Sequence, residues 1–167
     1  MLPPALETIL ADHERIKDLL PHRYPMLLVD AVRELRAGES IRAAKAVTLD
    51  EAPYARARGA ATGTATRSYP TSLVVESFCQ AAGILFMESG LGGYDPHRHV
   101  LLFGALAGCR VTGAAFPGDV LTHHARIVKA FSDSAVFAGE VAVGGRPVLT
   151  VDQVVMAVRD REMVMRS

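Results

Sequence analysis

The stretch 72-SLVVESFCQAAGILFMESG-90 decides the fold, because it is one apolar segment with a single carboxylate, Glu76, in its first half. Pro70 precedes it, and Thr71 or Ser72 is the expected N-cap, so a helix is predicted from about residue 71 to 88. Apolar residues fall on nearly every side of that helix, which is typical of a helix enclosed by the rest of the fold. A sheet wrapped around the helix would provide this enclosure.

The segments on both sides of the helix have strand character. "MLLVDAVREL" (26–35) and "SIRAAKAVTL" (40–49) flank a turn at "RAGE" and predict a hairpin. After the helix, antiparallel strands are predicted at "HVLLFGAL" (99–106), "CRVTGAA" (109–115), "VLTHHARIVKAF" (120–131), "SAVFAGEVAV" (134–143) and "VLTVDQVVMAVRD" (148–160). The expected fold class is therefore α+β, with an antiparallel sheet around a long central helix.

The remaining segments predict one further helix and one loop. Apolar residues recur at helical spacing over residues 6–20, up to Pro21. Residues 52–69 are small, polar and without periodicity, which predicts a mobile inserted loop. No repeat or linker divides the chain, so residues 1–167 are expected to form a single domain.

Composition excludes several classes of function. The chain has 18 basic and 18 acidic residues, and no basic stripe alternates with aromatic residues, which argues against nucleic acid as a partner. No apolar run reaches the ~18 to 20 residues of a membrane span, and residues 1–23 lack the features of a secretory signal, so a cytoplasmic protein is expected. Cys79 and Cys109 lack metal-ligand spacing and are expected to be buried apolar residues. No metal site is predicted.

Three motifs resemble the beta-hydroxyacyl-acyl carrier protein dehydratases of the FabZ type. "LLPHRYPMLLVDAV" at 19–32 is similar to the opening signature of that family. "YPTSLVVESFCQAAG" at 69–83 resembles its stretch M-P-G-V-L-I-I-E-A-M-A-Q-A-A-G, and "FPGD" at 116–119 resembles its V-P-G-D turn. The resemblance implies a dimeric hot-dog fold with a tunnel for an acyl chain. It implies no cofactor, because the substrate is carried on the phosphopantetheine of acyl carrier protein.

The resemblance also implies roles for individual residues. Glu76 falls on the position of the family's catalytic carboxylate, and burial is expected to raise its pKa so that it can donate a proton to the departing hydroxyl. Gln80 resembles the glutamine that accompanies the acid. Pro70 opens the helix, and Thr71 stands where the family has a glycine whose amide polarises the thioester carbonyl. The alternative is that Glu76 forms an ion pair with a core arginine such as Arg110.

The family's catalytic histidine is missing. In the family it lies in the sequence G-H-F-P, which does not occur in this chain, and the family's spacing leads to Thr62 instead. His123 and His124 are adjacent on a predicted strand, so one faces inward and one outward, and neither is expected to be the base. The other histidines are assigned to the first helix (His13), the P-H-R-Y-P signature (His22) and a turn (His97 and His99).

A chain with only the acid completes a site with a partner that supplies the base. The first hypothesis is therefore the acid-bearing subunit of a heterodimeric 3-hydroxyacyl-acyl carrier protein dehydratase, in polyketide, polyene or fatty acid type biosynthesis. Two alternatives stay open: a catalytically silent subunit that binds the acyl chain or stabilises its partner, and a hot-dog thioesterase.

The predicted loop carries a candidate docking site for the carrier protein. Arg56, Arg58 and Arg67 make it basic, and the docking face of a carrier protein is expected to be acidic. The alternative is a solvated loop in which the arginines serve solubility.

Overall fold

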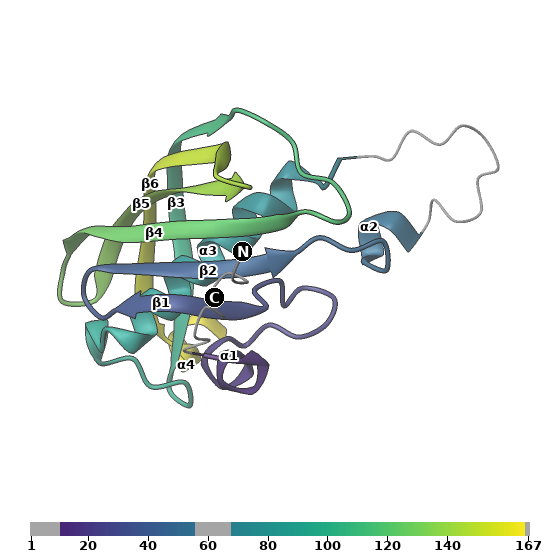
Figure 1. The fold of residues 1–167 in the computed structure, drawn as a ribbon. Helices are drawn as coiled ribbons and strands as arrows, with labels where there is room; N and C mark the ends of the chain where they lie inside the picture. Colours follow the sequence, from purple (N-terminus) through teal and green to yellow (C-terminus); the bar gives the residue numbers. More distant parts are fainter. Residues whose placement is uncertain (1–10, 56–67, 166–167) are drawn as a thin grey trace, which may run out of the picture.

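A computed structural model describes residues 11–55 and 68–165. Six antiparallel strands form one sheet in the order β1-β2-β4-β5-β6-β3, and the central helix α3 lies behind β2 and β4 in the view of Figure 1. The strands are β1 (Ala31–Arg36), β2 (Ser40–Ala46), β3 (His99–Val111), β4 (Val120–Ala130), β5 (Ser134–Val143) and β6 (Arg146–Asp160). The helices are α1 (His13–Leu19), α2 (Ala52–Ala55), α3 (Thr71–Glu88), α4 (Arg161–Met165) and the short 3-10 helix η2 (Leu91–Gly93). The α+β class and the hot-dog arrangement are confirmed.

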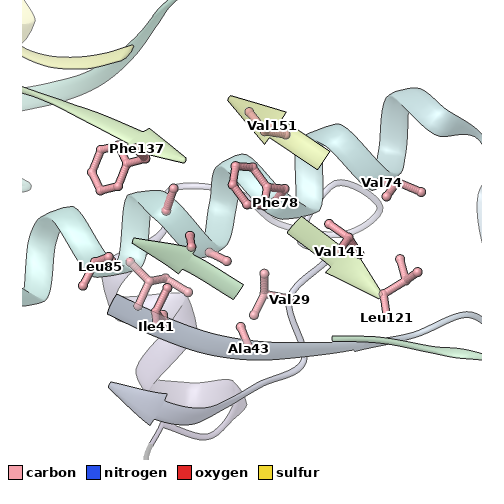
Figure 2. Close-up of a cluster of buried hydrophobic side chains, with 14 of the residues drawn as sticks. Val29, Ile41, Ala43, Val74, Phe78, Leu85, Leu121, Phe137, Val141 and Val151 are labelled. Atoms are coloured by element: carbon pink, nitrogen blue, oxygen red, sulfur yellow. The ribbon is translucent and has the colours of Figure 1, made fainter. Parts of the chain in front are cut away.

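The core lies between the sheet and one side of α3. Phe78, which is fully buried, and Val74 and Leu85 on the same helix belong to this core. Figure 2 shows them among strand side chains that include Ile41, Leu121, Phe137, Val141 and Val151. Burying a large apolar side chain of this kind stabilises the fold by about 1.5 to 3 kcal/mol. The expectation of a helix enclosed by a sheet is confirmed.

The helix begins differently from the expectation. Neither Thr71 nor Ser72 is the N-cap: α3 starts at Thr71, with Pro70 at the N-cap position and no side-chain capping bond. The fixed φ of proline favours the start of a helix, and the carbonyl of Pro70 accepts from the amides of Leu73 (2.9 Å) and Val74 (3.2 Å).

The hairpin of β1 and β2 is confirmed, but β1 starts at Ala31 rather than at Met26. In β3 the two predicted segments are one strand of 13 residues that ends at Val111. Gly108 lies within it at φ +61°, a conformation that favours glycine, and a Cβ there would collide with Asp152. The glycine at position 108 therefore allows β3 to continue past this point to Val111.

Other segments also depart from the predictions. The first helix covers only His13–Leu19 of the described residues, and α4 after β6 was not predicted. Residues 52–55, expected to open a loop, form α2, while 56–67 lie outside the described residues, so the mobility of that loop stays a prediction. No helix in the described part of the chain is long and apolar enough to cross a membrane.

Candidate active site

A mostly apolar cavity of about 350 Å³ runs along the side of α3 that does not face the core. The helix residues that line it recur every three or four positions and so share one face: Ser72, Val75, Glu76, Cys79, Gln80, Gly83 and Met87. The opposite wall comes from the segment before β1, from the start of β3 and from the end of β6. These lining residues include Leu20, Pro21, His22, Tyr94, His99, Leu101, Phe103, Met156 and Arg161.

Glu76 is the acidic residue in this cavity wall, with 33% of its side chain exposed. Its Oε1 lies 3.3 Å from Nε2 of His22 and accepts a hydrogen bond of 2.9 Å from Nε2 of Gln80. The alternative of a core ion pair with Arg110 is wrong, because the Arg110 guanidinium binds both carboxylate oxygens of Asp152 at 2.7 Å on the surface. The chain therefore places its helix carboxylate in a cavity rather than in a buried ion pair.

The pKa of Glu76 was expected to be raised, and this expectation is wrong for the chain on its own. The contact with His22 lowers the pKa most, burial acts in the opposite direction, and the bond from Gln80 lowers it further. A neighbouring donor stabilises the ionised form of a carboxyl group, and here this effect exceeds the effect of partial burial. Glu76 is thus a carboxylate near neutral pH in the chain alone.

Gln80 is 2% exposed and uses its whole amide group within the chain. Its Oε1 accepts from the backbone amides of Leu28 (2.9 Å) and Val29 (3.4 Å), and its Nε2 donates to the Met26 carbonyl (2.7 Å) and to Glu76. These bonds hold residues 26–29 against α3, which explains why β1 begins only at Ala31. Gln80 positions both the carboxylate of Glu76 and the segment that carries His22, and its predicted contact with substrate stays a prediction.

His22 is the site residue that sequence reasoning missed. The sequence places it in the P-H-R-Y-P signature, 54 residues before Glu76, and nothing in that spacing indicates contact. Its Nδ1 is buried and has no hydrogen-bond partner among the described residues. The neighbouring Arg23 donates to the carbonyls of Leu20 (2.8 Å) and His22 (2.7 Å), which fixes the turn that presents the imidazole to Glu76.

The other predicted site residues lie apart from Glu76 or outside the described residues. Thr71 lines a separate cavity of about 30 Å³, together with Tyr69 and Ala115. Pro70 stands at the start of α3 and is not among the residues that line the cavity of Glu76. Thr62 and the three arginines of the predicted docking site, Arg56, Arg58 and Arg67, lie outside the described residues.

The two adjacent histidines face opposite sides, as predicted. His123 is fully buried, 2.7 Å from Oγ of Ser77 and 3.4 Å from the Ala43 carbonyl, and burial lowers its pKa to about 4. His124 is exposed. Neither lines the cavity of Glu76. His99, by contrast, was assigned to a turn but starts β3 and lines that cavity.

The two cysteines differ from each other. Cys79 lines the cavity, and burial, followed by the nearby charge of Glu76, raises the pKa of its thiol to about 12. A thiol with such a pKa is a poor nucleophile at neutral pH. Cys109 lies on β3; it was expected to be buried and is exposed.

Comparisons with known proteins show the family of the chain. A family model described as "FabA-like domain" matches residues 20–152. A 3-hydroxyacyl-[acyl-carrier-protein] dehydratase FabZ from Colwellia psychrerythraea is 34% identical over 143 residues, which cover 84% of this chain and 89% of that protein. The FabZ of Thiobacillus denitrificans is 36% identical over 135 residues, which cover 80% and 88%.

Solved structures with the same fold include a dehydratase complex and several proteins described as thioesterases or hypothetical thioesterases. The dehydratase heterocomplex ApeI:P from Xenorhabdus doucetiae superposes with a TM-score of 0.71 at 17% identity, covering 90% of this chain and 95% of that one. A hypothetical thioesterase protein with coenzyme A from Streptococcus pneumoniae gives a TM-score of 0.56 at 13% identity, covering 77% and 84%. At these identities the likeness extends to the fold alone.

Proposed function

The chain belongs to the FabA-like family, as a member similar to FabZ dehydratases, and from that premise we propose that it is the acid-bearing subunit of a 3-hydroxyacyl-acyl carrier protein dehydratase. The observation that carries the proposal is the carboxylate of Glu76 in the wall of a mostly apolar cavity. A histidine-bearing homologous subunit supplies the base, because this chain has no G-H-F-P sequence. The pathway is of the polyketide, polyene or fatty acid type.

The proposed reaction is an elimination of water that uses one group from each subunit. The partner's histidine removes the α-proton of the acyl chain, the electrons of that bond form the double bond, and the C–O bond at the β-carbon breaks. Glu76 gives its proton to the leaving hydroxyl, so the products are an enoyl thioester and water. No cofactor takes part.

Because the pKa of Glu76 is low in the chain alone, the carboxylate must take up a proton before it can act as the acid. We expect substrate and partner to cover the cavity and remove water from the carboxylate, and this desolvation raises its pKa. Burial already acts in this direction in the chain alone, against the influence of His22. Assembly and proton uptake by Glu76 are therefore coupled in the proposed cycle.

Edge strand β3 supports the proposed pairing of subunits. Its outer side has no partner strand within the described sheet, and Leu102, Phe103 and Val111 on it are exposed. An open edge with exposed apolar residues is a surface where another sheet can continue. That a solved dehydratase of this fold is a heterocomplex is consistent with this arrangement. The docking role of Arg56, Arg58 and Arg67 stays a prediction.

A complementation assay tests the proposal. The test partner is a histidine-bearing homologue encoded nearby, in which the homologue's own helix carboxylate has been replaced so that it is inactive alone. We expect dehydration of 3-hydroxyacyl carrier protein only when the two chains are mixed, and a one-to-one complex in light scattering. An active isolated chain, or a mixture without enoyl product, would contradict the proposal. Release of free acid instead would indicate a thioesterase.

A second prediction concerns pH. His22→Leu removes the main influence that lowers the pKa of Glu76, while burial still raises it, so the pKa should rise. A general acid must be protonated, and activity therefore falls as pH rises through its pKa. We expect the falling limb of kcat against pH to move to higher pH in His22→Leu. Because Nδ1 of His22 has no partner among the described residues, the contact with Glu76 is the interaction of the imidazole that the substitution removes.

The control for this experiment is His97→Leu. His97 is exposed and does not line the cavity, so the dependence of kcat on pH in His97→Leu should match that of the wild type. An unmoved falling limb in His22→Leu would count against the acid role. A displaced rising limb would show that Glu76 acts as a base.

A further inference from the structure

The cavity contains a second group of polar side chains, Tyr94, His99 and Arg161. The helix residues that line the cavity extend eleven positions beyond Glu76 to Met87, which corresponds to about 16 Å along the helix axis. Tyr94 follows the end of α3 by a few residues, after η2. In the middle, Gly83 faces Leu101: a Cβ at Gly83 would lie 3.5 Å from its side chain. His99 lies two residues before Leu101 and is the first residue of β3, the strand that follows the C-terminal end of α3 in the chain.

The three polar side chains lie together. The rings of Tyr94 and His99 have centroids 6.4 Å apart. The backbone amide of Arg161 donates to the carbonyl of Arg98 (2.8 Å), and its guanidinium donates to the carbonyl of Pro96 (3.1 Å). Burial raises the pKa of Tyr94, and the charge of Arg161 acts in the opposite direction. The far end of the cavity is therefore polar, whereas Gly83 and Leu101 make its middle apolar.

These groups offer hydrogen-bond donors. The Asp95 amide donates to Nδ1 of His99 at 3.0 Å, so the proton of the neutral ring is on Nε2, which is a donor. Within residues 11–55 and 68–165, the hydroxyl of Tyr94 has no hydrogen-bond partner and Arg161 has no carboxylate partner. Guanidinium groups have donors and no acceptor. A ligand that satisfies such a set must present an acceptor oxygen.

We propose that this site selects acyl chains whose far end carries an acceptor oxygen, as a hydroxyl, carbonyl or carboxylate group, and that Arg161, Tyr94 and His99 bind that oxygen. This inference rests on the proposed function, because it assumes that the reacting end of the acyl chain lies at Glu76. Arg161 is exposed and keeps access to water, whereas Tyr94 and His99 are partly buried, so a methyl end would leave the donors of these two side chains without partners, which is unfavourable. The carboxylate is the favoured case, since a charged acceptor strengthens the hydrogen bond to a guanidinium.

The test compares three 3-hydroxyacyl carrier protein substrates of equal chain length that end in a methyl, a hydroxyl or a carboxylate group. With the assembled enzyme we expect KM for the carboxylate substrate to be at least tenfold lower than for the methyl substrate, with the hydroxyl substrate between them. Arg161→Gln should reduce the difference between carboxylate and methyl to less than threefold. The matched control is Arg98→Gln, which removes an exposed charge beside His99 and outside the cavity, and should keep the full difference.

A binding measurement separates this inference from the proposed function. Calorimetry of the chain with the three corresponding 3-hydroxyacyl pantetheine thioesters requires no turnover. Tighter binding of the oxygen-terminated thioesters, lost in Arg161→Gln, would support the site even if no dehydration occurs. Equal or better binding of the methyl-terminated thioester would overturn it, as would a preference for oxygen that survives in Arg161→Gln. Dehydration of all three substrates with equal KM would overturn the inference and leave the dehydratase proposal standing.

Discussion

Replacing Glu76 with glutamine is expected to lower the rate of dehydration by the assembled enzyme by about 10² to 10⁴, the usual range for loss of a general acid. The amide has nearly the size of the carboxyl group, and its oxygen can still accept the bond from Gln80. It has no proton that it can release to the leaving hydroxyl. The measurement is kcat with the partner present, alongside the melting temperature of the variant chain.

The fold should survive this substitution, because Glu76 is partly exposed and its contacts are with His22 and Gln80 at the cavity wall. The matched control is Glu88→Gln on the same helix. Glu88 has 25% of its side chain exposed, pairs with Arg15 at 2.7 Å and lies outside the cavity. We expect kcat of Glu88→Gln to stay within about twofold of the wild-type value. Full activity of Glu76→Gln with a lowered melting temperature would mean that Glu76 is structural.

The second large effect is expected for Gln80→Leu, and it concerns stability. The substitution leaves the buried amides of Leu28 and Val29, and the partly buried carbonyl of Met26, without their partner. Each buried polar group without a partner costs about 1 to 3 kcal/mol, so the free energy of unfolding should fall by roughly 2 to 5 kcal/mol. Denaturant unfolding of the isolated chain measures this value.

Gln153→Leu is the control for Gln80→Leu, because Gln153 is exposed on β6 and its loss should change the free energy of unfolding by no more than about 0.5 kcal/mol. A loss below about 1 kcal/mol for Gln80→Leu would contradict the anchoring role. It would mean that residues 26–29 keep their place through apolar contacts such as those of Leu28 and Val29.

Local patterns in the sequence predict much of this fold. The apolar stretch 72–90 predicts α3 with its bounds within one or two residues, and the segment 134–143 predicts β5 with its bounds unchanged. Such segments carry their own signal in periodicity and flanking turn residues. The start of β1 could not be predicted in this way, because it depends on hydrogen bonds from Gln80, a residue more than 50 positions away.

The candidate site was only partly predictable for the same reason. The resemblance to a family indicated Glu76 and Gln80, which are one turn apart on one helix face. The direction of the pKa shift of Glu76 could not be predicted, because it depends on His22, whose approach is set by the turn at Arg23 and by the anchor at Gln80. Burial alone suggested the opposite direction. The polar far end of the cavity joins three elements that have no common motif.

The two faces of helix α3 tolerate different substitutions, because one face packs in the core and the other lines the cavity. Phe78, Ala81 and Leu85 point to the core, where a change of one methylene is felt by close-packed neighbours. Val75, Cys79 and Met87 face the cavity, where a change in volume alters the space left for a ligand instead. Gene duplicates of this chain could therefore diverge in substrate through substitutions at three- and four-residue intervals along one helix while the folding pattern stays the same. Few substitutions are needed to change specificity, because the helix residues that line the cavity share a single face.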